Sequence, residues 1–194
     1  MKVLLDPAHG EDVKGKRSPD YRLREWSWSR EVIGMLEKRF DQLGIAHERT
    51  WDGDNEPGLG KRCKIANANA KIEPCILISM HCDALGNGEW MKARGWSARV
   101  GLNASTKSKK LATTIAKVAQ EKGIKVRTPK PGQLYWQQNL AICRDTSMPA
   151  VLIENLFMDN KEDLEYLLSD EGKRTLTEII VEGVCNYLGK IYEE

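Results

Sequence analysis

The sequence lacks any long hydrophobic run. The first apolar stretch, residues 3–5, ends at Asp6, and no later stretch approaches the roughly 20 residues that cross a bilayer. The first stretch is also too short for the apolar core of a signal peptide. We therefore expect a chain that is made in the cytoplasm without a signal peptide and does not insert into a membrane.

A cysteine framework and a dominant charge are also missing. The five cysteines include no C-x-x-C pair, and their odd number and apolar neighbours predict reduced, mostly buried thiols. Thirty basic residues are balanced by 28 acidic ones, which leaves a net charge of +2. This balance indicates neither a nucleic acid partner nor an anionic membrane surface.

One segment departs from the even charge distribution. Residues 107–130 contain eight basic residues against a single acidic one, Glu121, a local net charge of +7. A solvated helix face followed by a loop would account for this excess, and a surface that binds anions is the alternative.

Three short apolar runs predict buried strands that end beside polar residues. Residues 2–5 lead to His9, residues 75–83 contain His81, and residues 150–153 lead to Glu154. Continuous apolar strands are typical of parallel sheets covered on both faces. Ligands of such sheets bind beyond the carboxyl ends of the strands, so we expect the three polar side chains to meet there.

The rest of the chain alternates between strand and helix patterns, which predicts an α/β fold. At 194 residues the chain suits one domain. We expect a mixed, mainly parallel twisted sheet of about six strands, flanked by helices on both faces. The expected helices are residues 27–43, 61–70, 111–122, 161–168 and 171–187, and the further strands are residues 45–50, 96–100 and 139–143. Residues 124–137, with two prolines and a glycine, predict an irregular loop.

Two histidines and two glutamates could form a hydrolytic metal site. Zinc held by two histidines and one carboxylate keeps a fourth position for water and lowers the pKa of that water to about 7. A second carboxylate can then transfer protons. His9, Glu25, His81 and Glu154 supply these groups. The alternative is that the histidines are ordinary loop-edge residues and that Glu25 only favours a helix amino end.

Two further residues are not expected in the site. His47 lies within a predicted strand without a partner motif and is interpreted as a surface or packed histidine. Cys82 follows His81 directly, and on an extended chain its side chain points to the opposite face of the sheet.

Five short motifs occur in order along the chain. They are Asp6-Pro7-Ala8-His9-Gly10, Leu23-Arg24-Glu25, Leu59-x-x-Arg62-x-x-x-Ala66-Asn67, Ser79-Met80-His81-Cys82-Asp83-Ala84 and Pro149-Ala150-Val151-Leu152-Ile153-Glu154. Together they resemble the zinc-dependent N-acetylmuramoyl-L-alanine amidases of bacterial cell-wall lysis, from residue 3 to the terminal helix. The resemblance implies that His9, Glu25 and His81 bind one Zn²⁺ per chain and that Glu154 is the catalytic carboxylate.

The departures from this family pattern lie beside the ligands. Ala8 replaces a usual glycine, Asp83 replaces an asparagine, and Ser97 stands where a glutamate is common. Six tryptophans are a generous share for this length, and several fall in segments that we expect to border the site; sugar stacking is one interpretation and core packing the other. The candidate substrate contacts are Asp83, Trp90, Trp136 and Arg144.

The resemblance implies a peptidoglycan hydrolase that cleaves the amide between N-acetylmuramic acid and L-alanine of the stem peptide. Residues 1–194 would form the catalytic domain, without a separate wall-binding domain, and work as a monomer. In its expected lack of a signal peptide the chain resembles a phage or prophage endolysin, which is made in the cytoplasm and acts at the bacterial cell wall after release. Residues 107–130 could then contact anionic wall polymers. The alternatives are a host autolysin, a zinc peptidase or deacylase acting on soluble substrates, and a non-catalytic wall-binding module.

Overall fold

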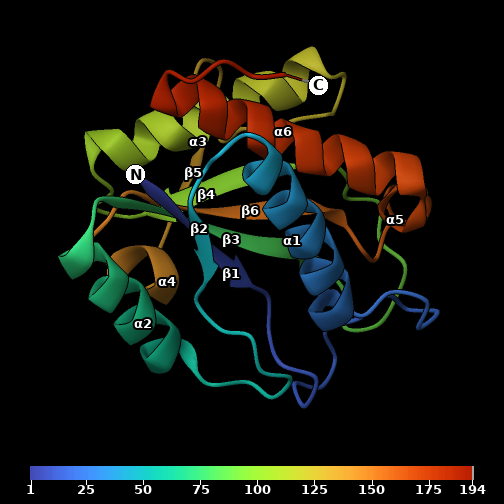
Figure 1. The fold of residues 1–194 in the computed structure, drawn as a ribbon. Coiled ribbons are helices and arrows are strands. Elements are labelled where there is room, and N and C mark those ends of the chain that lie inside the picture. The colour runs from blue at the N-terminus through green and yellow to red at the C-terminus, as the bar shows by residue number, and fades with distance from the viewer. Residues whose placement is uncertain (194) are drawn as a thin grey trace.

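Strands and helices alternate along residues 1–193, the part of the chain that the computed structural model describes (Figure 1). In order they are β1 (Lys2–Pro7), α1 (Glu25–Gln42), β2 (His47–Arg49), α2 (Leu59–Ile72), β3 (Cys75–Asp83), β4 (Ser97–Gly101), α3 (Thr106–Glu121), β5 (Trp136–Gln138), α4 (Ala141–Arg144), β6 (Ala150–Phe157), α5 (Lys161–Leu168) and α6 (Asp170–Leu188). This order confirms the expected α/β fold.

The strands form one six-stranded sheet in the order β2-β1-β3-β6-β4-β5. The four strands β2, β1, β3 and β6 run parallel, whereas β4 is antiparallel to β6 and pairs in parallel with β5. Residues 84–96, between β3 and β4, contain no helix that could carry the chain back across the sheet, so β4 runs in the opposite direction. The mixed, mainly parallel sheet was predicted correctly.

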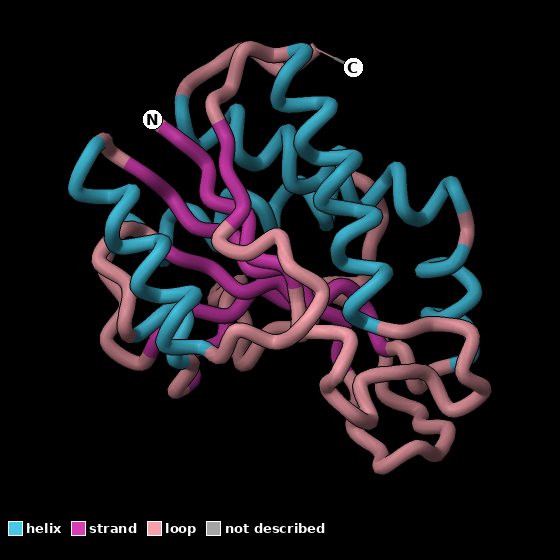
Figure 2. The backbone as a smooth tube through the Cα atoms, turned by 60° about the horizontal axis from the view of Figure 1, so that its bottom comes forward, coloured by secondary structure: helices cyan, strands magenta, loops and turns pink. Residues whose placement is uncertain are grey.

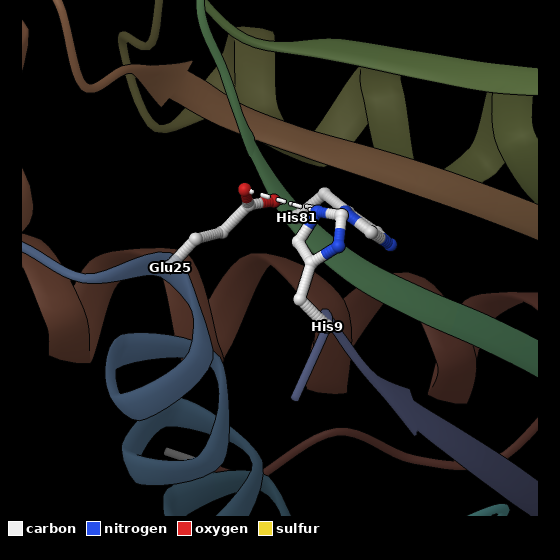
Figure 3. Close-up of side chains that lie close together, drawn as sticks. All are labelled: His9, Glu25 and His81. Atoms are coloured by element: carbon white, nitrogen blue, oxygen red, sulfur yellow. Dashed lines mark hydrogen bonds and ion pairs between the residues drawn. The ribbon is translucent and has the colours of Figure 1, made fainter. Parts of the chain in front are cut away.

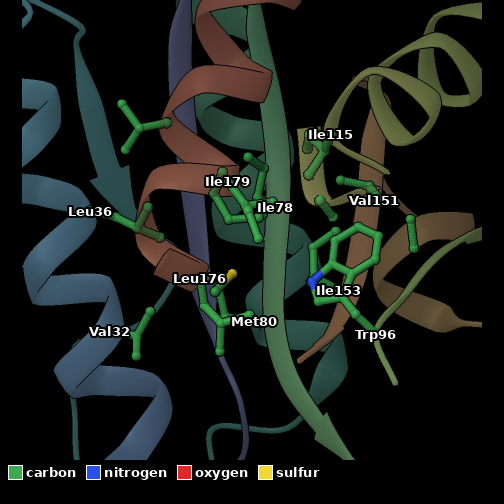
Figure 4. Close-up of a cluster of buried hydrophobic side chains, with 14 of the residues drawn as sticks. Val32, Leu36, Ile78, Met80, Trp96, Ile115, Val151, Ile153, Leu176 and Ile179 are labelled. Atoms are coloured by element: carbon green, nitrogen blue, oxygen red, sulfur yellow. The ribbon is translucent and has the colours of Figure 1, made fainter. Parts of the chain in front are cut away.

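Helices cover both faces of the sheet because successive residues of each strand point to opposite sides. On β1, Val3 and Leu5 face the large core under α1, α3, α5 and α6, while Leu4 faces a smaller core under α2 and α4. Figure 4 shows the larger core, with Ile78 and Val151 packed against helical side chains. The continuous apolar runs in the sequence thus reflect burial on both sides.

The predicted strand at residues 139–143 is wrong. The edge strand β5 ends at Gln138, after only three pairs with β4, and residues 141–144 form the single turn of α4. The carbonyl oxygen of Leu140 accepts hydrogen bonds from the amides of Cys143 and Arg144, and Ile142 is buried against the smaller core. A short apolar run does not distinguish a strand from one buried helical turn.

Helix α3 and strand β6 each extend well beyond their predicted bounds at one end. Helix α3 begins at Thr106 rather than residue 111, because Ser105 caps it by accepting a hydrogen bond from the Ser108 amide and its first turn is polar. Strand β6 continues to Phe157, so Glu154 lies within the strand instead of beyond its end.

The long loops gather at one end of the molecule, and the two chain termini lie at the other (Figure 2). The loop end is where β1, β3 and β6 finish. The chain leaves β1 for β2 on one side and later returns to β3 on the other, so the sheet order reverses between β1 and β3. Such a reversal point is a common binding position in α/β sheets. Across residues 1–193, no helix has both the length and the apolar character needed to cross a bilayer.

The contact between α3 and α6 provides a test of this packing. A Cβ added at Gly183 would lie 2.8 Å from the Cα of Ile115, which is backbone that cannot move aside, so Gly183→Ala should lower the free energy of unfolding by about 1–3 kcal/mol. Gly34→Ala is the matched control, because its Cβ would meet only an Arg49 side-chain atom at 3.9 Å and should raise stability by up to about 1 kcal/mol. Urea denaturation measures both changes, and equal shifts would contradict the close helix packing.

Candidate metal centre and active site

His9 lies two residues beyond β1, in a turn that the surrounding protein holds tightly. Its φ of +46° is unusual for a residue other than glycine. Arg30 donates hydrogen bonds to the carbonyl oxygens of Ala8, at 3.1 Å, and Gly53, at 3.0 Å, and Arg62 donates to that of Pro7. The unusual backbone of His9 is therefore stabilised by two guanidinium groups that bind the preceding carbonyls.

Glu25 is the first residue of α1 and is almost completely buried. Its amide donates to the Lys16 carbonyl at 2.9 Å, and its carboxylate accepts a hydrogen bond of 3.1 Å from the Cys82 amide. The apolar face of α1, represented by Val32 and Leu36, is buried against the sheet and fixes the position of this first turn.

The Glu25 carboxylate faces the imidazoles of His81 and His9, which lie together on one side of it (Figure 3). His81 Nδ1 lies 2.8 Å from one carboxylate oxygen, and His9 Nε2 lies 3.2 Å from the other. The two rings are perpendicular, with centroids 5.1 Å apart. One ligand atom from each of the three residues lies within 4.8 Å of the others. The structure therefore brings together the three residues that the sequence analysis assigned to a metal.

The electrostatics of this cluster also suit a cation. Burial alone would raise the pKa of Glu25, but hydrogen bonding to His81 and His9 lowers it below the usual value for a glutamate. Burial lowers the pKa of His81, yet the adjacent Glu25 carboxylate raises it overall. A buried anion that stays ionised calls for a positive partner. Two imidazole nitrogens and one carboxylate are the donor set of a catalytic zinc site, so the cluster fits the metal implied by the sequence.

Glu154 lies beside the cluster, on the same face of the sheet as His81. The two residues are register partners in the parallel pair of β3 and β6. One Glu154 carboxylate oxygen lies 3.5 Å from Arg99 Nη1, and the other is buried without a hydrogen-bond partner among the described residues. Burial, only partly opposed by His81 and Arg99, raises the pKa of Glu154 to about 7. A carboxyl with that pKa can accept and release a proton near neutral pH.

The remaining candidate residues lie at different distances in sequence and space from this cluster. Asp83 ends β3 and pairs with Arg99. Trp90 lies in the loop after β3 with 37% of its surface exposed, and Trp136 donates from Nε1 to the Arg127 carbonyl at 3.1 Å. Arg144, in α4, pairs with the neighbouring Asp145. Asp83 is therefore the candidate nearest to His81 along the chain, two residues beyond it on β3.

The two residues expected outside the site lie where they were predicted. His47, on β2, lies 3.0 Å from a carboxylate oxygen of Asp41 and is largely buried. Cys82 packs in the large core, on the face of the sheet opposite His81.

A cleft of about 410 Å³ opens beside the histidines. Its wall includes residues for which the sequence analysis predicted no contact, among them Arg62, Leu140 and Ile142. Arg62 belongs to one of the five motifs, so a signal was present, but no pattern indicated that it faces the cleft. Leu140 and Ile142 were missed because residues 139–143 were interpreted as a strand. The lining residues also include His9, His81, Val13, Lys16, Glu56, Leu59 and Leu152.

Known proteins resemble this chain in sequence and in fold over nearly its whole length. The N-acetylmuramoyl-L-alanine amidase family matches residues 3–186. The endolysin of Bacillus phage SPP1 is 30% identical over 190 residues, and a probable cell wall amidase, LytH, of Staphylococcus epidermidis is 27% identical over 195 residues. These alignments cover 96% and 95% of this chain but only 65% and 57% of the two relatives, so the chain spans less than two thirds of their length.

Solved amidase structures have the same fold as this chain. The N-acetylmuramoyl-L-alanine amidase from Clostridium difficile 630 superposes with a TM-score of 0.84 at 26% identity, covering 97% of this chain and 96% of that one. A Mycobacterium smegmatis amidase has the same TM-score at 20% identity, covering 97% of each chain, and thus shares the fold.

We predict that the cluster binds Zn²⁺ and that its affinity falls in acid. Protons compete for the imidazole nitrogens of His9 and His81, so lowering the pH from about 7.5 to about 5.5 should weaken binding at least roughly tenfold. Titration with a zinc indicator at each pH measures this. His81→Ala should abolish tight binding, whereas His47→Ala, which removes the one other histidine, should leave it unchanged; an affinity independent of pH would contradict ligation by the two imidazoles.

Proposed function

Because the chain belongs to the N-acetylmuramoyl-L-alanine amidase family, we propose that it hydrolyses the amide between N-acetylmuramic acid and L-alanine of the peptidoglycan stem peptide. The observation that carries this proposal is the position of Glu154, with one buried, unpartnered carboxylate oxygen, beside the cluster of His9, Glu25 and His81. The names of the relatives, an endolysin and a cell wall amidase, support peptidoglycan as the substrate.

In this proposal His9, Glu25 and His81 would hold one Zn²⁺ per chain. Zinc in such a site polarises a carbonyl and lowers the pKa of water to about 7. The contribution of the protein is to hold the three ligand groups close together, with Glu25 fixed at the first turn of α1 and His81 within β3.

Glu154 would act as the proton carrier. Its carboxylate takes the proton of the attacking water, and the resulting carboxylic acid gives that proton to the departing alanine amine. A pKa near 7 lets the same group perform both steps, since neither protonation state is strongly preferred at neutral pH. Arg99, 3.5 Å away, keeps the ionised form accessible in spite of burial.

The cleft beside the histidines would receive the substrate on both sides of the scissile amide. Asp83, Trp90, Trp136 and Arg144 are proposed to contact substrate outside that cleft. The exposed part of Trp90 offers a flat apolar surface, and tryptophan side chains present such surfaces to sugars and peptides through their faces.

We further propose that the chain acts as a phage or prophage endolysin, working as a monomer on the bacterial cell wall after release from the cytoplasm. The similarity to the endolysin of Bacillus phage SPP1 supports this choice over a host autolysin. Residues 107–130 would add attraction to anionic wall polymers. Of their basic side chains Lys122 pairs with Glu182, while Lys107, Lys110 and Lys117 are exposed along α3.

Replacing the proposed proton carrier should separate turnover from zinc binding. Glu154→Gln keeps the shape of the side chain but cannot accept the proton, so release of alanine amino termini from peptidoglycan should fall by about 10²- to 10⁴-fold while zinc content stays near one per chain. End-group analysis of digested sacculi and metal analysis measure the two quantities. Glu121→Gln, on an exposed side chain of α3, is the control and should behave as wild type.

Two outcomes would contradict the proposal. Loss of zinc in Glu154→Gln would mean that Glu154 is a ligand rather than the proton carrier. Zinc-loaded wild type that produces no alanine amino termini would indicate a peptidase or deacylase of soluble substrates instead.

The tryptophan contacts can be tested by substrate binding. Trp90→Ala removes a side chain that is partly exposed and lies under the Lys161 ammonium, so it should weaken binding to sacculi several-fold while the thermal midpoint stays nearly unchanged. Trp28→Ala is the contrasting variant. Trp28 is buried, so its replacement should leave a cavity and lower the thermal midpoint. Unaltered sacculus binding by Trp90→Ala would favour the packing interpretation.

A further inference from the structure

A second cavity lies next to the cleft, formed by the loop that leads from β1 into α1. It has a volume of about 410 Å³ and is lined by residues 11–17, Tyr21 and Arg24. Val13 and Lys16 line both the cleft and this cavity, so the two adjoin at these residues. The Lys16 carbonyl also accepts the hydrogen bond of the Glu25 amide, which places the loop directly against the metal cluster.

The acidic side chains of this cavity have hydrogen-bond or ion-pair partners within residues 1–193, whereas most of its basic side chains do not. Its lining has four basic residues against two acidic ones. Arg24 is engaged by Glu11 through its carbonyl and its carboxylate, and Asp12 accepts a hydrogen bond of 2.7 Å from the Glu56 amide. Glu11 is therefore engaged with Arg24 and Asp12 with the Glu56 amide, so both acidic side chains already have partners.

The lysines of the cavity have no such partners. Lys14 and Lys16 make no side-chain hydrogen bond or ion pair with any residue in 1–193, and Arg17 only stacks on the ring of Tyr21, 4.0 Å from its centroid. Two ammonium groups and one guanidinium thus line a cavity without a protein anion to bind them.

We infer that this cavity, with Lys14 and Lys16 as its main contacts, binds a free carboxylate of the stem peptide. The inference rests on the proposed function and specifies its substrate. If the scissile amide lies at the metal cluster, the peptide continues from L-alanine at no more than about 3.3–3.6 Å per residue, so the second residue lies within reach of the adjoining cavity. A γ-linked D-glutamate at that position carries a free α-carboxylate, and amidation of that group removes its charge.

The preference for a free α-carboxylate over its amidated form should be moderate and sensitive to salt. Lysine ammonium groups that remain exposed form weak ion pairs, and added salt screens them. We therefore expect wild type to bind the carboxylate form roughly three- to tenfold more tightly than the amidated form at low salt, with a smaller ratio at high salt.

The test uses two free tripeptides, the cleavage products, that differ only in whether the α-carboxyl of the second residue is free or amidated. Calorimetric titration of the zinc-loaded chain measures their affinities without any need for turnover. In Lys14→Gln/Lys16→Gln the two affinities should become equal. Lys71→Gln, which alters an exposed lysine of α2 at the opposite end of the sheet, should keep the wild-type preference.

Cleavage of the corresponding muramoyl tripeptides is measured in parallel, so the two proposals can fail separately. A carboxylate preference without cleavage would overturn the amidase function and leave the anion site intact. Equal affinities in wild type, or no binding of either peptide, would overturn the anion site whether or not cleavage occurs. A double variant that keeps the preference but loses binding to teichoic acid would assign the lysines to a wall polymer and also overturn the inference.

Discussion

The site depends on one buried charge, the Glu25 carboxylate. Removing a carboxylate from water is costly unless hydrogen bonds and positive partners compensate. Here the compensation comes from the His9 and His81 rings and from the Cys82 amide. Burial of the apolar face of α1 prevents Glu25 from withdrawing to solvent, so the turn after β1 and the end of β3 are held where their imidazoles meet it.

A second buried network of polar side chains supports the turn after β1 that carries His9. Asp6 and Arg62 form an ion pair in which both side chains are about 97–98% buried. Asp6 also accepts hydrogen bonds from the hydroxyls of Thr50 and Ser79, which joins β1 to its neighbours on both sides. Arg62 in turn holds Glu56 through both carboxylate oxygens. Asp6 and Arg62 are motif residues to which the sequence assigned no chemical role. They support the backbone that positions His9.

The antiparallel strand β4 gives the proton carrier its surroundings. Ser97 of the antiparallel strand β4 is the register partner of Glu154, and Arg99, two residues further along β4, points to the same side of the sheet. Arg99 also binds Asp83, which follows His81 by two residues. One guanidinium thus links the end of β3, which carries His81, to the carboxyl that would transfer protons, and it limits the rise of the pKa of Glu154 that burial causes.

The sequence by itself determined the strands with continuous apolar character, the helices with a buried stripe, and the set of His9, Glu25, His81 and Glu154, because side-chain periodicity and ordered motifs are local properties. It did not determine that residues 141–144 form a helical turn, that β6 extends beyond Glu154, or that Arg62, Leu140 and Ile142 line the cleft. Those features depend on which surface each segment meets after folding. The position of Lys14 and Lys16 in the cavity beside the cleft likewise depends on the path of a loop. That path is set by contacts between segments far apart in the sequence, such as the one between Asp12 and Glu56. Only the tertiary structure decided these features. The free energy of burying a side chain or pairing a charge depends on which groups meet in the folded chain, and the sequence positions of the two groups do not show that they meet.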